Sequence, residues 1–234
     1  MIHPTKILLT VAFSLLSVLT AQAANTQIAT TQAAKTSTIP ISYLPFPPIT
    51  APGTYVLTGN LSFTGVTNTD QGAITIHEPI GGAVILDLKG FTITNANTGA
   101  QNNAILIRSF VPGGTNNAIT IRNGTITFPH GVDDEQVSDV TITNVTFNDN
   151  PNPQTGSGPF VQAINFQTVS NAIVNNCHFI SSSGGDGISD FGSLGGNSYS
   201  NNTFLHLYTS LAVGSYTAPN LVLDRCQFAA PPSN

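Results

Sequence analysis

The sequence predicts an all-β fold in which parallel strands stack into a solenoid, and three observations lead to this prediction. Only six basic and eleven acidic residues occur among 234, so charged residues make up 7% of the chain, and the 23 asparagines outnumber them. A soluble domain usually carries about 25% charged residues, and a helical bundle needs them on its exposed faces. The other two observations are a motif that recurs along the chain and the alternation of apolar and polar residues inside it, which is the period of a β-strand.

The composition also excludes several classes of protein. Hydrophobic residues make up 40% of the chain, which is too many for a disordered protein. Six basic residues leave no cationic patch for a nucleic-acid backbone, so we expect no nucleic-acid partner. No apolar stretch reaches the roughly 18 residues of a membrane span, so we expect none in the mature protein.

The first 48 residues look unlike the rest. Lys6 precedes a short apolar run over residues 7–20, and Ala21-Gln-Ala23 fits a small-residue cleavage site, so we expect residues 1–23 to be a signal peptide. Export then makes the protein secreted, either extracellular or periplasmic. Residues 24–48 are polar, aperiodic and interrupted by prolines, which favours a disordered tether. We expect the ordered domain to span residues 49–234.

Six units in that domain share one pattern: alternating apolar residues, an Asn or Gly, and two more apolar residues spaced by one. They occupy residues 86–93, 119–126, 140–147, 172–179, 197–204 and 221–228. The last unit carries Arg225 in place of the Asn. Repeats of 20–50 residues indicate solenoids in which each unit buries its apolar face on its neighbours. Each unit is therefore expected to be two short strands joined by a tight bend, with the Asn or Gly in the left-handed region.

A third strand precedes each unit. The candidates are residues 73–77, 104–108, 131–135, 163–167, 187–191 and 210–214. Three strands per coil describe a parallel β-helix of about six coils.

These features resemble the right-handed parallel β-helix proteins, the pectin-lyase-like superfamily. Asn123, Asn144, Asn176 and Asn201 look like the internal asparagine ladder of that superfamily, and residues 52–61 resemble its lead-in strand. The resemblance covers residues 49–234 and implies the fold, but it says little about chemistry. Three of these asparagines also match the glycosylation sequon, and we expect the structural role to prevail.

The two cysteines test the expected register. Cys177 and Cys226 occupy the same inward position after the bend, but Asn202 occupies it in the coil between them. Two coils separate Cα atoms by about 9.6 Å, beyond the roughly 7 Å that a disulfide can bridge. We therefore expect two free, buried thiols.

The scarce charges converge on the outward face of the third strands. Alternation places His77, Arg108 and Glu135 on successive strands in one outward row, and Asp133 in the neighbouring row. On the functional interpretation, Asp133 and Glu135 are catalytic acids, and Arg108 or His77 is a base or charge stabiliser. Asp133 and Asp134 would be the ligands of a calcium ion, since hard cations take carboxylate oxygens. The alternative is a set of compensating surface charges, each pair worth about 0–1 kcal/mol.

The catalytic motifs of the resembling enzymes match this chain poorly. Asn68-Thr-Asp70 and Asp133-Asp134 resemble two polygalacturonase motifs, but they lie about two coils apart. The Gly-His-Gly and Arg-Ile-Lys motifs of that family are absent. Pectate-lyase-like chemistry requires an Arg or Lys beside clustered calcium-binding Asp residues, which only Arg108 could supply.

Two hypotheses follow. The first is a secreted β-helix protein that binds carbohydrate or serves as a surface or matrix module without efficient catalysis. The alternative is a polysaccharide lyase or glycoside hydrolase that acts on an acidic polysaccharide at the first-strand face, with calcium as its cofactor if it has one. Because the last coil ends with no capping helix, we also expect self-association through its strand edges.

Overall fold

The computed structural model describes residues 38–65, 72–78, 81–96, 103–109, 118–148, 162–181, 185–191, 195–205, 207, 209–214 and 221–229. The chain divides into two compact units, residues 1–37 and 38–234, and every described residue lies in the second. The expected signal peptide and most of the expected tether lie outside the described residues.

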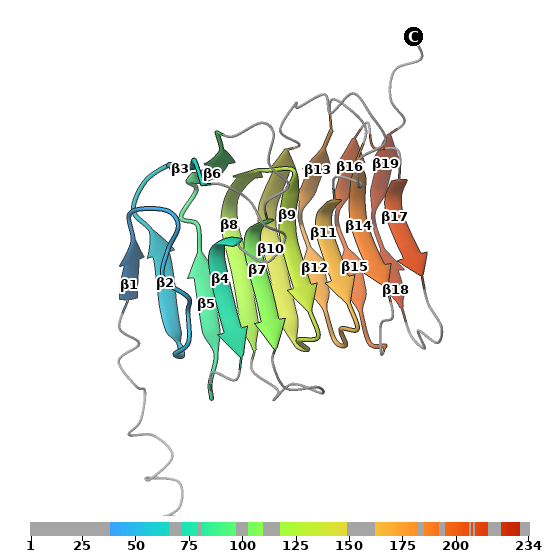
Figure 1. Cartoon of the computed structure of the whole chain (residues 1–234). Helices are drawn as coiled ribbons and strands as arrows, with labels where there is room; N and C mark the ends of the chain where they lie inside the picture. Colours follow the sequence, from blue (N-terminus) through green and yellow to red (C-terminus); the bar gives the residue numbers. More distant parts are fainter. Residues whose placement is uncertain are drawn as a thin grey trace, which may run out of the picture. The chain divides into compact units, whose positions relative to one another are not determined.

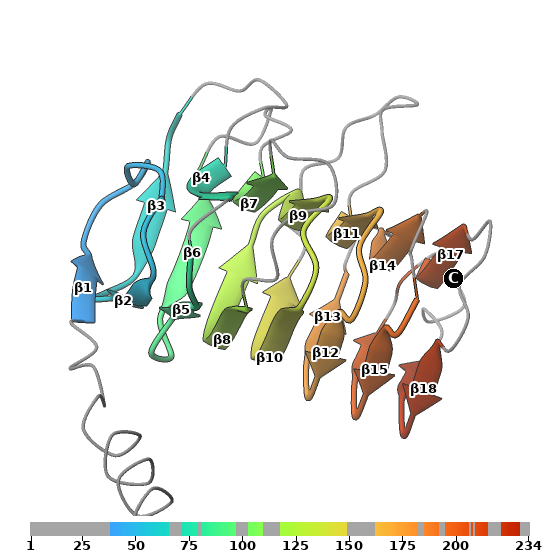
Figure 2. The same cartoon turned by 90° about the horizontal axis from the view of Figure 1, so that it is seen from below.

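The described residues form a parallel β-helix, which confirms the predicted fold class (Figure 1). Each coil contributes one strand to each of three faces, and all the strand pairs are parallel. Seen from below, the coils follow one another as successive turns (Figure 2). Within this part of the chain, no helix is long and apolar enough to cross a membrane.

Two of the faces belong to one 13-stranded sheet. The first face consists of β2 (Gly53–Leu57), β5 (Val84–Asp87), the first halves of β8 (Ile119–Thr127) and β10 (Val140–Asn148), β12 (Ile173–Asn175), β15 (Ser198–Ser200) and β18 (Val222–Asp224). The second face consists of β3 (Leu61–Phe63), β6 (Thr92–Asn95), the second halves of β8 and β10, β13 (His178–Ile180), β16 (Thr203–Leu205) and β19 (Gln227–Ala229).

The third face is a separate six-stranded sheet. It consists of β4 (Gly72–Glu78), β7 (Asn103–Ser109), β9 (His130–Glu135), β11 (Gln162–Gln167), β14 (Asp186–Phe191) and β17 (Thr209–Gly214). All six third strands therefore lie where the sequence predicted them, and each of the six coils has three strands.

The bends also follow the prediction at most positions. Asn123, Asn144, Asn176 and Asn201 have φ between 54° and 60°, and Arg225 has φ 49°. A side chain with φ > 0 is uncommon outside Asn, Asp and Gly, so the asparagines adopt the bend at the lowest cost.

One bend differs from the predicted frame. The frame set Leu88 opposite Ile121, but the structure pairs Leu86 with Ile121 and Asp87 with Arg122. The following strands pair as expected, with Thr92 opposite Thr125. The bend between β5 and β6 is therefore two residues longer than the frame allowed.

The bend asparagines do not form the internal ladder that the resemblance implied. Asn144 Nδ2 donates to Asn123 Oδ1 at 3.2 Å, and Asn176 Nδ2 donates to Asn144 Oδ1 at 2.7 Å. Asn201, however, donates to Asn175 Oδ1 at 2.9 Å. The side chains of Asn144, Asn176 and Asn201 are exposed, so these amides lie on the outer side of the bend, and the prediction of an internal position is wrong.

Asp87 begins this outer row of hydrogen bonds. Its carboxylate accepts from Arg122 Nε at 3.0 Å, from Asn123 Nδ2 at 3.2 Å and from the Lys89 backbone N–H at 3.0 Å. Burial acts to raise the pKa of Asp87, but these hydrogen bonds and the charge of Arg122 outweigh it and hold the pKa below its usual value.

The interior is filled by rows of matching side chains. Phe179 stacks between Phe147 and Phe204, with ring centroids 5.1 and 4.6 Å away, and Phe228 stacks on Phe204 at 5.0 Å. On the third face, the residues predicted to point inward are buried; they are Ile74, Ile76, Ile105, Ile107, Val132, Ile164, Phe166 and Ile188. Leu211 is half-buried, and the side chain of Val213 lies outside the description.

The cysteines follow the predicted register. Cys177 and Cys226 lie in one row with Asn202 between them, and both are free. Burial raises the pKa of the Cys177 thiol to about 12. Cys226 is half-buried, so the prediction of a buried thiol holds fully only for Cys177.

Part of the expected tether is ordered structure. Strand β1 (Thr38–Ile41) pairs with β2, and the Ile41 side chain is buried. Phe46 and Ile49 then donate backbone hydrogen bonds to Ala73 and Thr75 of β4, at 3.0 and 2.8 Å. Residues 38–49 thus cover strand edges of the first coil, and the described ordered structure begins at Thr38 instead of Ile49. The prolines of this segment made an ordered strand hard to recognise in the sequence. Proline interrupts a central strand, but it is accepted on an edge strand such as β1.

The last coil exposes its apolar side chains. Leu223 is 51% exposed and Phe228 is 56% exposed, although both continue buried rows of the preceding coils. Self-association through this coil stays a prediction, since the structure holds a single chain.

Replacement of Phe179 by Ala should lower the free energy of unfolding by about 3–5 kcal/mol, because it leaves a cavity inside the aromatic stack. Urea denaturation measures the change. Phe191→Ala is the matched control, since Phe191 is 45% exposed on the outer surface and should cost about 0.5 kcal/mol or less. Equal losses from the two variants would contradict the inward placement of Phe179.

Candidate functional site

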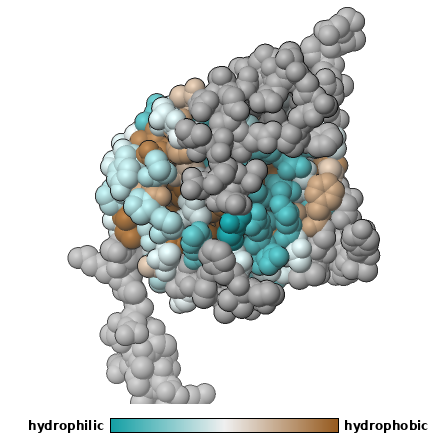
Figure 3. Space-filling model, viewed as in Figure 1, coloured by the Kyte–Doolittle hydropathy of each residue, from teal (hydrophilic) through white to brown (hydrophobic). Residues whose placement is uncertain are grey.

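The outer face of the six-stranded sheet carries two rows of side chains that neighbour each other across parallel strands. The first row is His77, Arg108, Glu135, Gln167 and Phe191. The second row is Thr75, Leu106, Asp133, Asn165 and Ser189. Both rows match the predicted register, but the side chains of Thr75, Leu106 and Ser189 are buried, so the second row is accessible at Asp133 and Asn165. Figure 3 views the molecule from the side of this sheet and shows hydrophilic residues gathered on that face.

Arg108 and Glu135 form a two-pronged ion pair between β7 and β9. Arg108 Nε donates to Glu135 Oε2 at 2.7 Å, and Arg108 Nη2 donates to Oε1 at 3.2 Å. Both side chains are largely buried, with 22% and 30% of their surfaces exposed. A bidentate guanidinium–carboxylate contact fixes the plane of both groups, so neither side chain turns freely toward solvent.

Asp133 is held by amides instead of by a cation. Asn165 Nδ2 and Gln167 Nε2 donate to Oδ1 at 2.9 and 3.4 Å, and Asn103 Nδ2 donates to Oδ2 at 3.1 Å. Burial raises the pKa of Asp133 above its usual value, and the negative charge of Glu135 acts in the same direction. The three amide hydrogen bonds oppose this rise without cancelling it.

His77 begins the first row. It lies directly opposite Arg108 on the neighbouring strand, and its side chain is half-buried. The structure thus brings His77, Arg108, Glu135 and Asp133 to one face, as the sequence suggested. Whether they carry out catalysis stays a prediction.

Asp134 does not join this face. It lies opposite Ile107 and Phe166, its side chain is fully buried, and its Oδ1 accepts a hydrogen bond from the Val137 N–H at 3.3 Å. Successive residues of a strand point to opposite sides, so Asp133 and Asp134 cannot converge on one calcium ion. Among the described residues, no group of three or more His, Cys, Asp or Glu side chains could hold a metal ion. The prediction of a calcium site formed by Asp133 and Asp134 is therefore wrong.

A second carboxylate lies in the interior. Asp190 Oδ2 accepts hydrogen bonds from Tyr199 Oη at 2.7 Å and from Asn197 Nδ2 at 3.0 Å. Burial raises the pKa of Tyr199 well above its usual value, and the Asp190 carboxylate raises it further. Asp190 occupies the inward row beside Phe166, so it serves the core and not the outer face.

Sequence reasoning missed the amides that hold Asp133. The pattern identified charged residues as candidates, but Asn103 and Gln167 reach Asp133 diagonally, across strands, which alternation along one strand does not reveal. The inward position of Asp134 was available in the sequence, since the alternation that places Val132 inside also places Asp134 inside.

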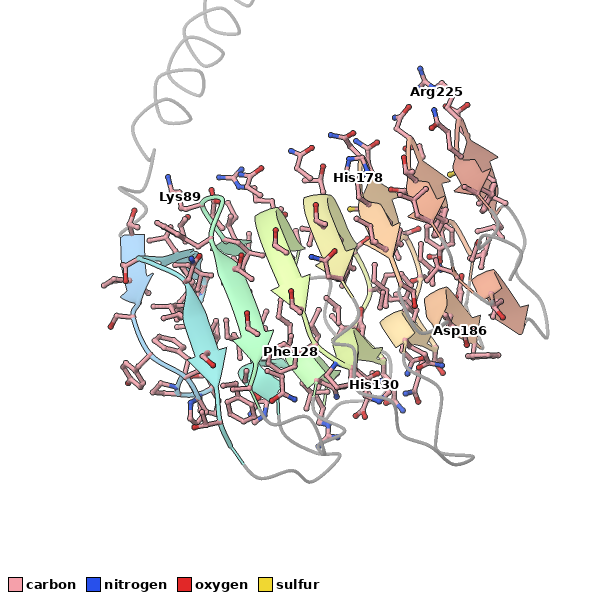
Figure 4. The ribbon with its side chains drawn as sticks, turned by 90° about the horizontal axis from the view of Figure 1, so that it is seen from above. Lys89, Phe128, His130, His178, Asp186 and Arg225 are labelled. Atoms are coloured by element: carbon pink, nitrogen blue, oxygen red, sulfur yellow. The ribbon has the colours of Figure 1, made fainter. Side chains whose placement is uncertain are left out.

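The chain also has a small cavity at another place. Its volume is about 20 Å³, and Phe128 and Asp186 are among its lining residues. Figure 4 shows Phe128, His130 and Asp186 along one side of the solenoid and Lys89, His178 and Arg225 along the opposite side. Such a volume holds about one water molecule, so the cavity does not provide a ligand site.

Burial lowers the pKa of His130, which keeps its ring neutral near pH 7.

The first polygalacturonase-like motif, residues 68–70, lies outside the described residues.

Comparison with known proteins yields little. No protein-family model matches the chain, and no curated protein matches it. Among solved structures, the chain is similar to a protein from Parabacteroides merdae ATCC 43184 named as a "putative glycosyl hydrolase". The identity is 13%, the TM-score is 0.33, and the alignment covers 85% of this chain and 84% of that chain.

The free energy of unfolding should depend on pH in opposite ways at Asp133 and at Asp87. The raised pKa of Asp133 means that the folded state holds the proton more tightly than the unfolded state. Relative to Asp133→Asn, wild-type stability should fall as pH rises from about 3.9 through the raised pKa.

The comparison with Asp87→Asn should have the opposite slope. The lowered pKa of Asp87 gives the wild type an advantage above about pH 3.9, and this advantage is lost as pH falls through the folded-state pKa. Urea denaturation between pH 2.5 and 7, in steps of about 0.5, measures both slopes. Parallel slopes for the two variants would contradict the environments described for these carboxylates.

Proposed function

We propose that this protein is a secreted parallel β-helix of the pectin-lyase-like superfamily whose six-stranded sheet binds carbohydrate with its outer face, without efficient catalysis. One observation carries the proposal: Glu135, Gln167 and Phe191 lie next to one another on β9, β11 and β14, and Asp133 and Asn165 lie beside them. Strands about 4.8 Å apart arrange these planar groups at regular intervals along the axis.

This arrangement suits the chemistry of a sugar. A pyranose ring presents hydroxyl groups around its edge and C–H groups on its faces. Planar carboxylate and amide groups bind the hydroxyls, and an exposed aromatic ring packs against the C–H face. Phe191, 45% exposed, is the aromatic group on this face.

The polar groups are also held in place before any ligand binds. Asp133 accepts three amide hydrogen bonds, and Glu135 is paired with Arg108 at two points. Side chains that are already ordered lose little conformational entropy on binding, which favours affinity. A binding or surface module makes use of such a fixed array without any further chemistry.

Glycoside hydrolysis is the second candidate, and the raised pKa of Asp133 favours it. A carboxyl group with a raised pKa is a suitable general acid. Asp133 and Glu135 are two residues apart on one face, so their Cα atoms are about 7 Å apart, and a glycosidase requires two such carboxyl groups near one glycosidic bond. The bidentate pair with Arg108 opposes this function, because both carboxylate oxygens of Glu135 already accept hydrogen bonds from Arg108. The same pair opposes a lyase that needs Arg108 as its base.

Two assays on the mature protein separate the candidates. Affinity electrophoresis in gels that contain neutral or acidic polysaccharides measures binding. Reducing ends and the absorbance of unsaturated products, with and without calcium, measure catalysis. Binding without product supports a binding module, whereas product that disappears in Asp133→Asn supports the enzyme.

Phe191→Ala should weaken binding about tenfold, because the loss of an aromatic contact costs about 1 kcal/mol beyond its buried area. Val222→Ala is the control, since Val222 is 50% exposed on the last coil, away from this face. An unchanged affinity in Phe191→Ala would contradict the proposed surface.

Export of the protein is part of the proposal. The support is the arrangement of Lys6, the apolar run over residues 7–20 and the Ala21-Gln-Ala23 site. Expression in a secreting host should yield a mature protein that starts at Ala24. Mass spectrometry of the intact protein checks this, and an uncleaved N-terminus in the exported fraction would contradict it.

A further inference from the structure

The outer face offers little positive charge to a ligand. The described basic residues are Lys89, Arg108, Arg122 and Arg225, and of these Arg108 alone lies on the six-stranded sheet. Its Nε and Nη2 atoms both donate to Glu135. A guanidinium group recognises a carboxylate best through two parallel N–H donors, and here Glu135 already occupies such a pair.

The other basic residues lie elsewhere. Arg122 pairs with Asp87 on the first face, and Arg225 pairs with Asp224 in the last bend, each at 3.0 Å. Lys89 and Arg225 lie along the opposite side of the solenoid from Asp186, the first residue of β14 (Figure 4). On the candidate face, His77 is the only other described residue that can carry a positive charge.

The same face is rich in hydrogen-bond acceptors. Asn165 and Gln167 each direct an amide N–H toward Asp133, which leaves their carbonyl oxygens for other partners, whereas Asn103 is buried. Asp133 and Glu135 add four carboxylate oxygens when ionised. Sugar hydroxyls can donate to these oxygens, but the carboxylates and sulfates of an acidic polysaccharide only accept, so they find few donors and face like charge.

We propose that the ligand of this face is a neutral, hydroxyl-rich glycan and that the Arg108–Glu135 pair excludes acidic polysaccharides. The inference rests on the proposed carbohydrate-binding function and replaces the acidic substrate that the sequence suggested for an enzyme. Phe191 lies two strands from Glu135, which separates their Cα atoms by about 9.6 Å, so the site is longer than one pyranose ring. Glu135 sets the specificity, since it neutralises the one Arg at the site.

The experiment compares neutral glycans, represented by mixed-linkage β-glucan, galactomannan and arabinan, with polygalacturonate and alginate. The mature wild-type protein is tested by affinity electrophoresis and calorimetry at low and at physiological salt. We expect binding to at least one neutral glycan, and binding to polygalacturonate that is at least about tenfold weaker.

Glu135→Gln tests the proposed role of the ion pair. It removes the carboxylate that engages Arg108, so we expect a gain of about tenfold or more in affinity for polygalacturonate, which should decrease as salt is added. Asp224→Asn is the matched control. It causes the same change in net charge and removes the carboxylate partner of Arg225, but Arg225 lies in the last bend, so we expect no gain. Circular dichroism establishes that each variant is folded.

Each outcome is decisive. Wild-type binding to polygalacturonate as tight as to neutral glycans overturns the inference and leaves the proposed function intact. Binding to no glycan of either class overturns both. A folded Glu135→Gln variant that gains no more than Asp224→Asn overturns the role of the ion pair. If Glu135→Gln does not fold, the wild-type comparison alone decides the ligand class.

Discussion

In-register pairing of parallel strands is the constraint on which the rest of this structure depends. Each coil sets its residues directly over the equivalent residues of the preceding coil, about 4.8 Å away. A side chain therefore has its nearest neighbours on adjacent coils, 21 to 35 residues distant along the chain. The stacked rings of Phe147, Phe179 and Phe204 and the amide contacts of Asn123, Asn144 and Asn176 are consequences of this one spacing.

The same constraint explains how the few charges are used. Arg108 lies directly opposite Glu135, and Arg122 lies directly opposite Asp87, so each pair joins adjacent strands at matching positions. Outward positions elsewhere carry Thr, Ser and Asn, which form hydrogen bonds without requiring a counter-charge. The low charge content is thus a property of the fold. It leaves one Arg among the described residues of the candidate face, and the proposed choice of ligand depends on the pairing of that Arg with Glu135.

The inward rows of the six-stranded sheet show which side-chain directions follow from the alternation in the sequence. Alternation correctly placed Ile105, Ile107 and Val132 inside because side-chain direction on a strand is a local property. The same rule places Asp134 inside, but its charge suggested an outward position, and the structure buries it.

The strand at the edge of the first coil was not predicted, for another reason. Thr38–Ile41 shows neither the repeat nor an uninterrupted apolar pattern, and its pairing with β2 is visible only in three dimensions.

The sequence by itself determined the coil count, the position of each third strand, the bends at asparagine and the two rows of the candidate face. These features follow from the period of two along a strand and from the length of the repeat, and both are local. Only the tertiary structure decided that three amides from two neighbouring strands hold Asp133, that the bend asparagines lie outside and that Glu135 engages two donors of Arg108. Those contacts depend on side-chain direction and on diagonal reach between coils, which the order of residues does not specify.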